Sequence, residues 1–230
     1  RALVAALQPH APTGALPALQ RLAEADEVFL ERQADALLLG LQTGLDLATA
    51  PLVAAALQVC WTHLVLTTQA QAAGRAAPFG RIDEETNCPC CGSRPVASLT
   101  RSSGESLGQR YLHCSLCSTQ WHLVRIRCSH CLSGQKLAYQ SLDLAADGAP
   151  DAQRATRASL QAETCDDCGH YLKILHSDRD PMVEPVADDL ASLTLDLLVS
   201  EAGYRRHGLN LMLLFGDAPE AAPPPDPGAP

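Results

Sequence analysis

Basic residues are scarce in this chain of 230 residues. Seventeen Lys and Arg stand against 26 Asp and Glu, which gives a formal net charge of −9. Proteins that bind nucleic acids concentrate Lys and Arg against the phosphates, so a nucleic acid is not expected as a partner. Hydrophobic residues make up 47% of the chain, enough for a folded core. This composition excludes the collagen-like and wholly disordered classes.

The chain also lacks an apolar run long enough to be a clear membrane span or secretory signal. Residues 47–74 contain no Asp, Glu, Lys or Arg, but polar side chains interrupt the strongest apolar stretch, Leu52–Leu66. A span needs about 20 mostly apolar residues, so we predict the central buried helix of a helical bundle instead. The opening apolar run stops before Pro9, too early for a signal peptide.

Cysteine, by contrast, is abundant, and nine of the ten cysteines fall between residues 88 and 168. Two thiolates in one tight Cys-x-x-Cys turn can bind a single metal ion, and two such turns complete a tetrahedral site of four sulfurs. Zn²⁺ or a single iron ion fits that site better than an iron–sulfur cluster. The four pairs are Cys88/Cys91, Cys114/Cys117, Cys128/Cys131 and Cys165/Cys168.

Pairing neighbouring turns predicts two metal sites in sequential order. Sequential pairing is favoured because its loops are shorter to close, and an interleaved arrangement is the alternative. A disulfide framework is disfavoured by the missing secretory signal and by the adjacent Cys90 and Cys91. The predicted ligand sets are Cys88, Cys91, Cys114 and Cys117 for the first site, and Cys128, Cys131, Cys165 and Cys168 for the second.

The remaining cysteines and the histidines are assigned no chemistry. Cys60 and His63 lie three residues apart in the apolar segment and are predicted to be a buried thiol and a hydrogen-bonded core histidine. Cys90, inside the first pair, is interpreted as a bystander, with an oxidisable spare thiol as the alternative. Histidines near the pairs are expected to face solvent, since the thiolates already fill both sites. These histidines are His113, His122, His130, His170 and His176.

Hydrophobic periodicity predicts an α+β protein. The first part is rich in Ala and Leu at helical spacing, including an amphipathic helix from Thr13 onward. Short runs rich in β-branched and aromatic residues then alternate with the cysteine turns, as expected for hairpin-built modules, before a helical period returns. The predicted ranges are 1–82 for an all-α domain, 83–126 and 127–180 for two metal modules, 181–216 for a C-terminal helical segment, and 217–230 for a disordered proline-rich tail.

Four segments carry a more specific pattern. They are Cys88-Pro89-Cys90-Cys91-Gly92-Ser93, Arg110-Tyr111-Leu112-His113-Cys114-Ser115-Leu116-Cys117, Glu163-Thr164-Cys165-Asp166-Asp167-Cys168 and Ala187-Asp188-Asp189-Leu190-Ala191-Ser192-Leu193. In this order, the chain from about residue 87 to 215 resembles the bacterial formate dehydrogenase accessory proteins of the FdhE type. The helical first 80 residues match that family only loosely. Members are generally longer at the N-terminus, so Arg1 is expected to be an internal residue of the gene product.

The resemblance implies a cytoplasmic, non-enzymatic factor needed for active respiratory formate dehydrogenase, binding its catalytic subunit before export. It also implies rubredoxin-like modules in which the eight paired cysteines hold two metal ions, iron being favoured and zinc the alternative. Cys90 stands where the family usually has another residue, so no role is carried over to it.

We place a candidate partner surface on the helix around Asp188, Asp189 and Asp196, with an ordinary capped core helix as the alternative. Two other functions are kept as alternatives: an iron-dependent electron-transfer or thiol oxidoreductase protein, and a nucleic-acid-binding zinc ribbon. Against the zinc ribbon, residues 81–178 contain ten Lys or Arg and eleven Asp or Glu, so this region is not basic.

Overall fold

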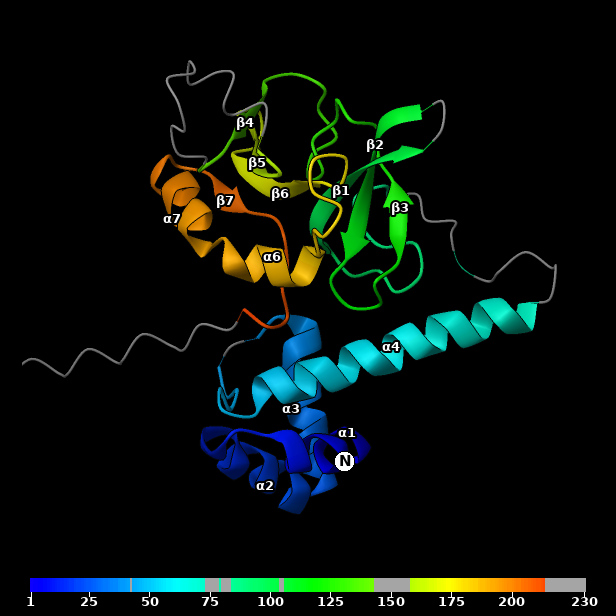
Figure 1. Cartoon of the computed structure of the whole chain (residues 1–230), viewed down its shortest axis with the longest axis vertical. Coiled ribbons are helices and arrows are strands. Elements are labelled where there is room, and N and C mark those ends of the chain that lie inside the picture. The colour runs from blue at the N-terminus through cyan, green and yellow to red at the C-terminus, as the bar shows by residue number, and fades with distance from the viewer. Residues whose placement is uncertain (42, 73–78, 80–83, 104–105, 143–157, 214–230) are drawn as a thin grey trace, which may run out of the picture. The chain divides into compact units, whose positions relative to one another are not determined.

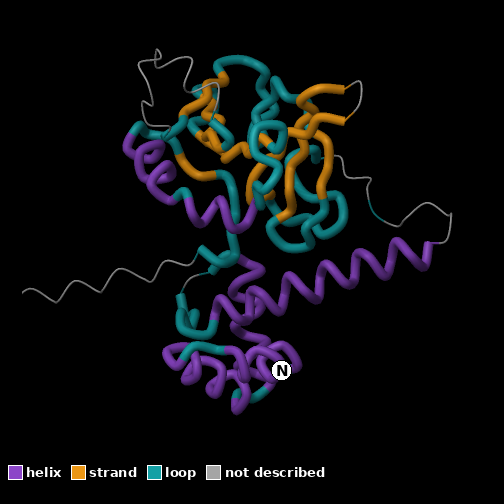
Figure 2. Tube along the Cα trace, viewed as in Figure 1, coloured by secondary structure: helices purple, strands orange, loops and turns teal. Residues whose placement is uncertain are grey.

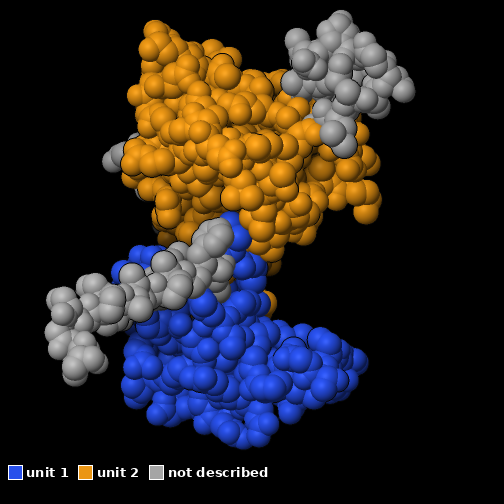
Figure 3. Space-filling view, turned by 90° about the vertical axis from the view of Figure 1, so that its left-hand side faces the viewer, with its two compact units in different colours: residues 1–56, 212–230 blue, residues 57–211 orange. Residues whose placement is uncertain are grey.

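The computed structural model describes residues 1–41, 43–72, 79, 84–103, 106–142 and 158–213. The chain divides into two compact units, residues 1–56 with 212–230 and residues 57–211, which are coloured separately in Figure 3. The polar segment 147–158 inside the second metal module is predicted to be exposed; residues 147–157 lie outside the described residues, and Ala158 is buried. The predicted tail at 217–230 also lies outside them.

Helices form the N-terminal part of the chain, as predicted (Figure 2). The amphipathic pattern that starts at Thr13 forms two helices, not one, with the break at Ala25 and Asp26. The Asp26 side chain accepts a hydrogen bond of 2.7 Å from the backbone N–H of Phe29 and so caps a new helix. The helices are α1 (Ala2–Leu7), α2 (Leu16–Glu24), α3 (Glu27–Leu39) and α4 (Ala50–Ala72).

The prediction that the uncharged segment is a buried central helix is wrong. Helix α4 does form there, but Val59, Leu64 and Leu66 are each more than half exposed. By length and composition alone, α4 is long and apolar enough to cross a membrane, and 22% of its most apolar stretch is buried. This is weak evidence for a membrane span, because core helices of soluble proteins can be equally long and apolar. Burial depends on the rest of the fold, which an apolar run alone does not specify.

The second unit is built on one seven-stranded sheet (Figure 1). Its main path runs β3-β2-β1-β6-β5-β4, and β7 pairs with β6. Neighbours along the path are antiparallel except β1 and β6, which are parallel. The strands are β1 (Pro95–Ser103), β2 (Ser106–Cys114), β3 (Gln120–His122), β4 (Leu137–Gln140), β5 (Leu160–Cys165), β6 (His170–His176) and β7 (Arg205–Arg206).

This strand order repeats one three-stranded unit. Strands β1, β2 and β3 form an antiparallel ladder in sequence order, and so do β4, β5 and β6. The first strand of the first unit pairs in parallel with the last strand of the second. The two predicted metal modules therefore lie in tandem in one continuous sheet and share its core.

Two helices, α6 (Pro185–Ala191) and α7 (Leu193–Glu201), pack on one face of the sheet (Figure 1). Val186 of α6 packs against the β1 core, and Leu195 and Val199 of α7 pack with Tyr171 of β6. The opposite face has a second apolar cluster of Leu112, Leu123 and Leu172. Successive residues of a strand face opposite sides of the sheet. Strand β6 therefore contributes Tyr171 to the core beneath the helices and Leu172 to the apolar cluster on the opposite face.

A buried ion pair links the two three-stranded units. Arg110 of β2 lies 2.9 Å from the Glu163 carboxylate of β5, and both side chains are almost inaccessible to solvent. Arg110 also donates to the backbone oxygen of Arg127 at 2.7 Å, and the Tyr139 hydroxyl donates to Glu163 at 3.0 Å. Such a pair is costly to break from one side, because the remaining charge would be buried alone.

Candidate metal centres

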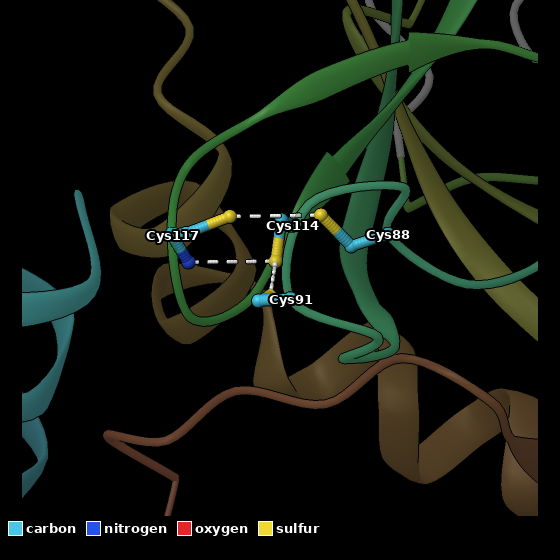
Figure 4. A group of neighbouring side chains, drawn as sticks. All are labelled: Cys88, Cys91, Cys114 and Cys117. Atoms are coloured by element: carbon cyan, nitrogen blue, oxygen red, sulfur yellow. Dashed lines mark hydrogen bonds between the residues drawn. The ribbon is translucent and has the colours of Figure 1, made fainter. Parts of the chain in front are cut away.

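The structure groups the cysteines in sequential order, as predicted, and the interleaved alternative is wrong. Four sulfur ligands within 4.8 Å of one another come from each of two sets. Figure 4 shows the first set, with the four side chains converging from two turns. The sets are Cys88, Cys91, Cys114 and Cys117, and Cys128, Cys131, Cys165 and Cys168.

Each cluster has the same construction. One turn precedes the first strand of its three-stranded unit, and the other lies between the second and third strands. Antiparallel pairing of those strands brings both turns to the same end of the sheet. Each turn is followed at once by a residue with positive φ, which reverses the chain towards the next strand. These residues are Gly92, Ser118, Leu132 and Gly169.

Backbone N–H groups surround the sulfurs of the first cluster. Cys90 N–H donates to Cys88 Sγ at 3.4 Å, and Leu116 and Cys117 N–H groups donate to Cys114 Sγ at 3.3 and 3.4 Å. Such bonds stabilise negative charge on sulfur, and they tune the potential of a bound iron. The turns thus supply both the ligands and the dipoles that favour the thiolate form.

The sulfur separations fit one ion in each cluster. In the first cluster Cys88 and Cys117 are 3.5 Å apart, and Cys91 and Cys114 are 3.4 Å apart. In the second cluster the corresponding separations are 3.7 and 3.8 Å. A tetrahedral ion with metal–sulfur bonds near 2.3 Å requires sulfurs about 3.8 Å apart. Each cluster could hold one metal ion, and an all-thiolate donor set suits iron and zinc alike.

Proton sharing among the sulfurs differs between the clusters. In the first, hydrogen bonding with the Cys114 thiol lowers the pKa of Cys88 to about 7 and also lowers the pKa of Cys117, while the pKa values of Cys91 and Cys114 are raised by hydrogen bonding among the same sulfurs. In the second, burial raises the pKa of Cys128 to about 11. In the first cluster Cys88 and Cys117 therefore favour the thiolate form, whereas Cys91 and Cys114 favour the thiol form before a cation binds.

The two clusters also differ in exposure. In the first, three cysteines are buried and Cys91 is half-buried. In the second, Cys131 is exposed and Cys168 is half-buried. An ion in the second cluster would therefore lie closer to solvent than an ion in the first.

The unpaired cysteines lie outside both clusters. Cys60 is exposed, not buried as predicted, because the face of α4 that carries it is uncovered. His63 is likewise exposed, with Thr67 Oγ1 at 3.4 Å from its Nε2. Cys90 is half-buried, and burial raises the pKa of its thiol.

The expectation that the histidines near the cysteine pairs face solvent holds for His122 and His130, which are exposed, and fails for His113 and His176, while His170 is half-buried. His113 and His176 are buried in the sheet. His130 and His170 stack with ring centroids 3.8 Å apart, and His207 meets His130 edge-on at 5.0 Å. This group, which we call the histidine cluster (His130, His170 and His207), lies beside Cys168 of the second metal cluster. The sequence alone does not predict this group, because His130, His170 and His207 come from three segments that only the fold brings together.

The three aspartates proposed as a partner surface lie in different environments. Asp189 is fully buried and Asp196 nearly so, while Asp188 is half-exposed and accepts from the N–H of Glu184. Lys173 Nζ is 3.3 Å from Asp189 and 2.6 Å from Asp196, and Arg206 contacts both carboxylates. Asp189 and Asp196 thus bind α6 and α7 to strands β6 and β7, and neither presents an exposed face.

Comparison with known proteins shows that models of a single protein family match most of the chain. Family models described as "FdhE, N-terminal", "FdhE, central domain" and "FdhE, C-terminal domain" match residues 1–77, 87–125 and 126–213. Protein FdhE of Escherichia coli O9:H4 is 41% identical over 216 residues, as is Protein FdhE of Shigella boydii serotype 18. The alignments cover 94% of this chain and 64% of those relatives, so the chain spans about two-thirds of their length.

A crystal structure is similar as well. The FdhE protein from Pseudomonas aeruginosa matches with a TM-score of 0.77 and 40% sequence identity, covering 94% of this chain and 71% of that one. The similarity extends over both the helical part and the part that contains the cysteine clusters.

Proposed function

This chain belongs to the FdhE family, and we propose that it is an accessory factor for the formation of active respiratory formate dehydrogenase. The observation that carries the proposal is the presence of both complete four-cysteine clusters in a chain that family models match over residues 1–77, 87–125 and 126–213. The partner that we propose is the catalytic subunit of that enzyme, bound in the cytoplasm before export.

The role is proposed to be non-enzymatic. A site with four thiolate ligands has no open position where a substrate or water could bind the metal. Both clusters have this closed donor set. A structural or redox role of the metal, in support of partner binding, fits this chemistry better than metal-assisted hydrolysis.

We propose iron as the resident metal, with zinc as the alternative. The eight cysteines would hold two ions, and the N–H groups around the sulfurs would stabilise the thiolate charge. Anaerobic purification followed by metal analysis and a visible spectrum separates the two metals. Ferric thiolate absorbs strongly and bleaches on reduction, whereas Zn²⁺ is colourless and redox-silent.

One observation favours electron transfer as a second candidate function. Cys131 is exposed, which would bring an ion in the second cluster near the surface, where a redox partner could approach. A visible spectrum that cycles reversibly between oxidised and reduced forms would support this function. Zinc as the isolated metal would eliminate it.

Co-purification tests the proposed partner. Tagged full-length chain, expressed in a bacterium that makes respiratory formate dehydrogenase, should retain the catalytic subunit. Replacing Cys165 and Cys168 by Ser should reduce that retention, since the second cluster would lose two ligands. Cys60→Ser is the matched control, because Cys60 is exposed and belongs to neither cluster. An intact, folded chain that retains no formate dehydrogenase subunit would refute the proposal.

A further inference from the structure

A second set of metal-ligating atoms lies next to the second cysteine cluster. Ligand atoms of His130, Cys168 and His170 all lie within 4.8 Å of one another. His130 comes from the first turn of that cluster, and His170 opens β6 just after the second turn. His130 is exposed and the other two are half-buried, so a cation could reach them from solvent.

The orientation of His170 suits a metal ligand. Its Nδ1 lies 2.9 Å from the backbone oxygen of Cys168, and a carbonyl can only accept a hydrogen bond. Nδ1 must therefore carry the hydrogen, which leaves the lone pair on Nε2. Histidines that bind metals commonly have this arrangement, in which the other ring nitrogen donates to a carbonyl.

The histidine cluster also contains an unpaired buried nitrogen. His207 is 5% exposed, and its Nε2 has no hydrogen-bond partner among the described residues. His207 is not among the three residues whose ligand atoms lie within 4.8 Å of one another, so it borders the site and is not one of its ligands. The buried His207 ring contacts the exposed His130 ring edge-on, at an interplanar angle of 81°.

We propose that Cys168, His130 and His170 form a third metal-binding site, which loads the second cysteine cluster with a divalent transition-metal ion. One thiolate and two imidazoles form a borderline donor set that suits Zn²⁺ or Co²⁺. The two imidazole rings are nearly parallel, with an interplanar angle of 12°, so binding of one ion by both requires one ring to rotate. His130 is exposed, which leaves room for its ring to rotate. The inference rests on the proposed metal occupancy of the second cluster.

Cys168 belongs to both ligand sets, which gives a route for transfer. Two metal–nitrogen bonds break and three metal–sulfur bonds form to Cys128, Cys131 and Cys165, while the thiol protons pass to water. No electron is transferred. The third site offers one thiolate and two neutral imidazoles against the four thiolates of the cluster, so it holds a divalent ion more weakly. Weak binding suits a position from which the ion moves on.

The equivalent place in the first cluster is different. Cys90 occupies the turn position that His130 occupies in the second, and Thr119 stands where His170 does. Cys90 and His130 both donate their backbone N–H to the first cysteine of their turn at 3.4 Å. With no imidazole at either position, the first cluster has no counterpart of the third site.

Metal titration of the full chain tests the proposal. Protein carrying two equivalents of Zn²⁺ should bind one further equivalent of Co²⁺ at His130 and His170, with the shared Cys168 thiolate bridging the two ions and a visible spectrum of mixed nitrogen and sulfur ligation. His130→Asn with His170→Asn should abolish that third equivalent, since Asn retains a polar side chain but offers no imidazole. His122→Asn is the matched control, because His122 is an exposed strand histidine outside all three ligand sets.

Loading kinetics test the role of the site. The double variant should take up its second zinc ion about tenfold more slowly than wild type while reaching the same final two equivalents. Failure of the first two equivalents to bind would overturn the proposed metal clusters themselves. Two normal equivalents without a third, or a third that survives in the double variant, would overturn only the third site. Unchanged loading kinetics would overturn its role as a loading position.

Discussion

The two metal modules are built on the same three-stranded unit, yet their clusters differ in exposure and surroundings. The first cluster is mostly buried and has Cys90 and Thr119 at its two flanking positions. The second has an exposed ligand, Cys131, with His130 and His170 at the equivalent positions. The repeated backbone fixes where four sulfurs meet, whereas the residues between and beside them decide what can reach the metal. This difference predicts a more structural first cluster and a more accessible second one.

Removing one ligand from each cluster is the strongest test of this comparison. Cys114→Ser should cost more than about 4 kcal/mol of unfolding free energy, the range expected when a buried metal site is lost. Cys131→Ser should also lose one metal but destabilise the chain less, because Cys131 is exposed. Urea unfolding with metal counting measures both effects. Equal destabilisation by the two substitutions would contradict the proposed division of roles.

The buried ion pair between the modules gives the next largest effect. Arg110→Met would leave the Glu163 carboxylate buried without its cation, at a cost of about 3–5 kcal/mol. Adding Glu163→Gln should recover most of that loss, since the Tyr139 hydroxyl can still bond to the amide. A double-mutant cycle in urea measures the coupling. Glu85→Gln, which breaks the exposed pair with Arg127, should cost less than about 1 kcal/mol and serves as the control.

A pH titration probes the parallel strand pair that joins the modules. His176 of β6 contacts Thr100 Oγ1 of β1 at 3.0 Å, and Gln161 of β5 at 2.7 Å. Burial lowers the pKa of His176 to about 4, with Arg179 and Arg125 acting in the same direction and Asp178 in the opposite one. The unfolded chain, with an ordinary histidine pKa near 6.5, then binds the proton more readily than the folded chain.

Stability contributed by neutral His176 should therefore be complete above pH 6.5 and fall by up to about 3 kcal/mol as the pH drops to 4. Unfolding free energies measured across this range for wild type and His176→Gln check the effect. The variant should show a flatter profile in this interval. Identical slopes would show that other groups, not the joint between the modules, set the acid sensitivity.

The smallest effect comes from the residues with positive φ that follow the cysteine turns. Ser118 has φ 57° and is exposed, so Ser118→Gly should stabilise the first module by about 0.5–1 kcal/mol. Leu132 has φ 61° but packs against the cluster of Leu112, Leu123 and Leu172, so Leu132→Gly should destabilise the second. Thermal unfolding of both variants measures the sign. Stabilisation by both substitutions would mean that Leu132 packing contributes little.

The sequence predicted those features that depend on local spacing. The four Cys-x-x-Cys turns and their sequential grouping follow from short-range geometry, and the strand at Pro95–Ser103 follows from its β-branched and apolar residues. Strand β5 could not be predicted in this way because Gln161 and Glu163 interrupt its apolar pattern, yet both are buried with partners supplied by other strands. Such burial cannot be inferred before the strand pairing is known.

The same limit explains the errors at the C-terminal helices. Asp189 and Asp196 carry charge at helical spacing and so resembled an exposed face, but Lys173 and Arg206 neutralise them in the interior. The helical segment itself divides at Ser192, and Leu197 and Leu198, although apolar, are exposed. Long-range charge pairing, which no local pattern encodes, decides which side of these helices packs on the sheet.

The parallel pairing of β1 with β6 also sets an order of events during synthesis. Thr100 and His176, which meet across this pair, are 76 positions apart in the chain. When the first module has left the ribosome, β1 can pair with β2 but has no neighbour on its other side. An open strand edge of this kind can recruit the wrong chain. The nascent protein therefore has a vulnerable interval that ends only when β6 emerges and closes the sheet.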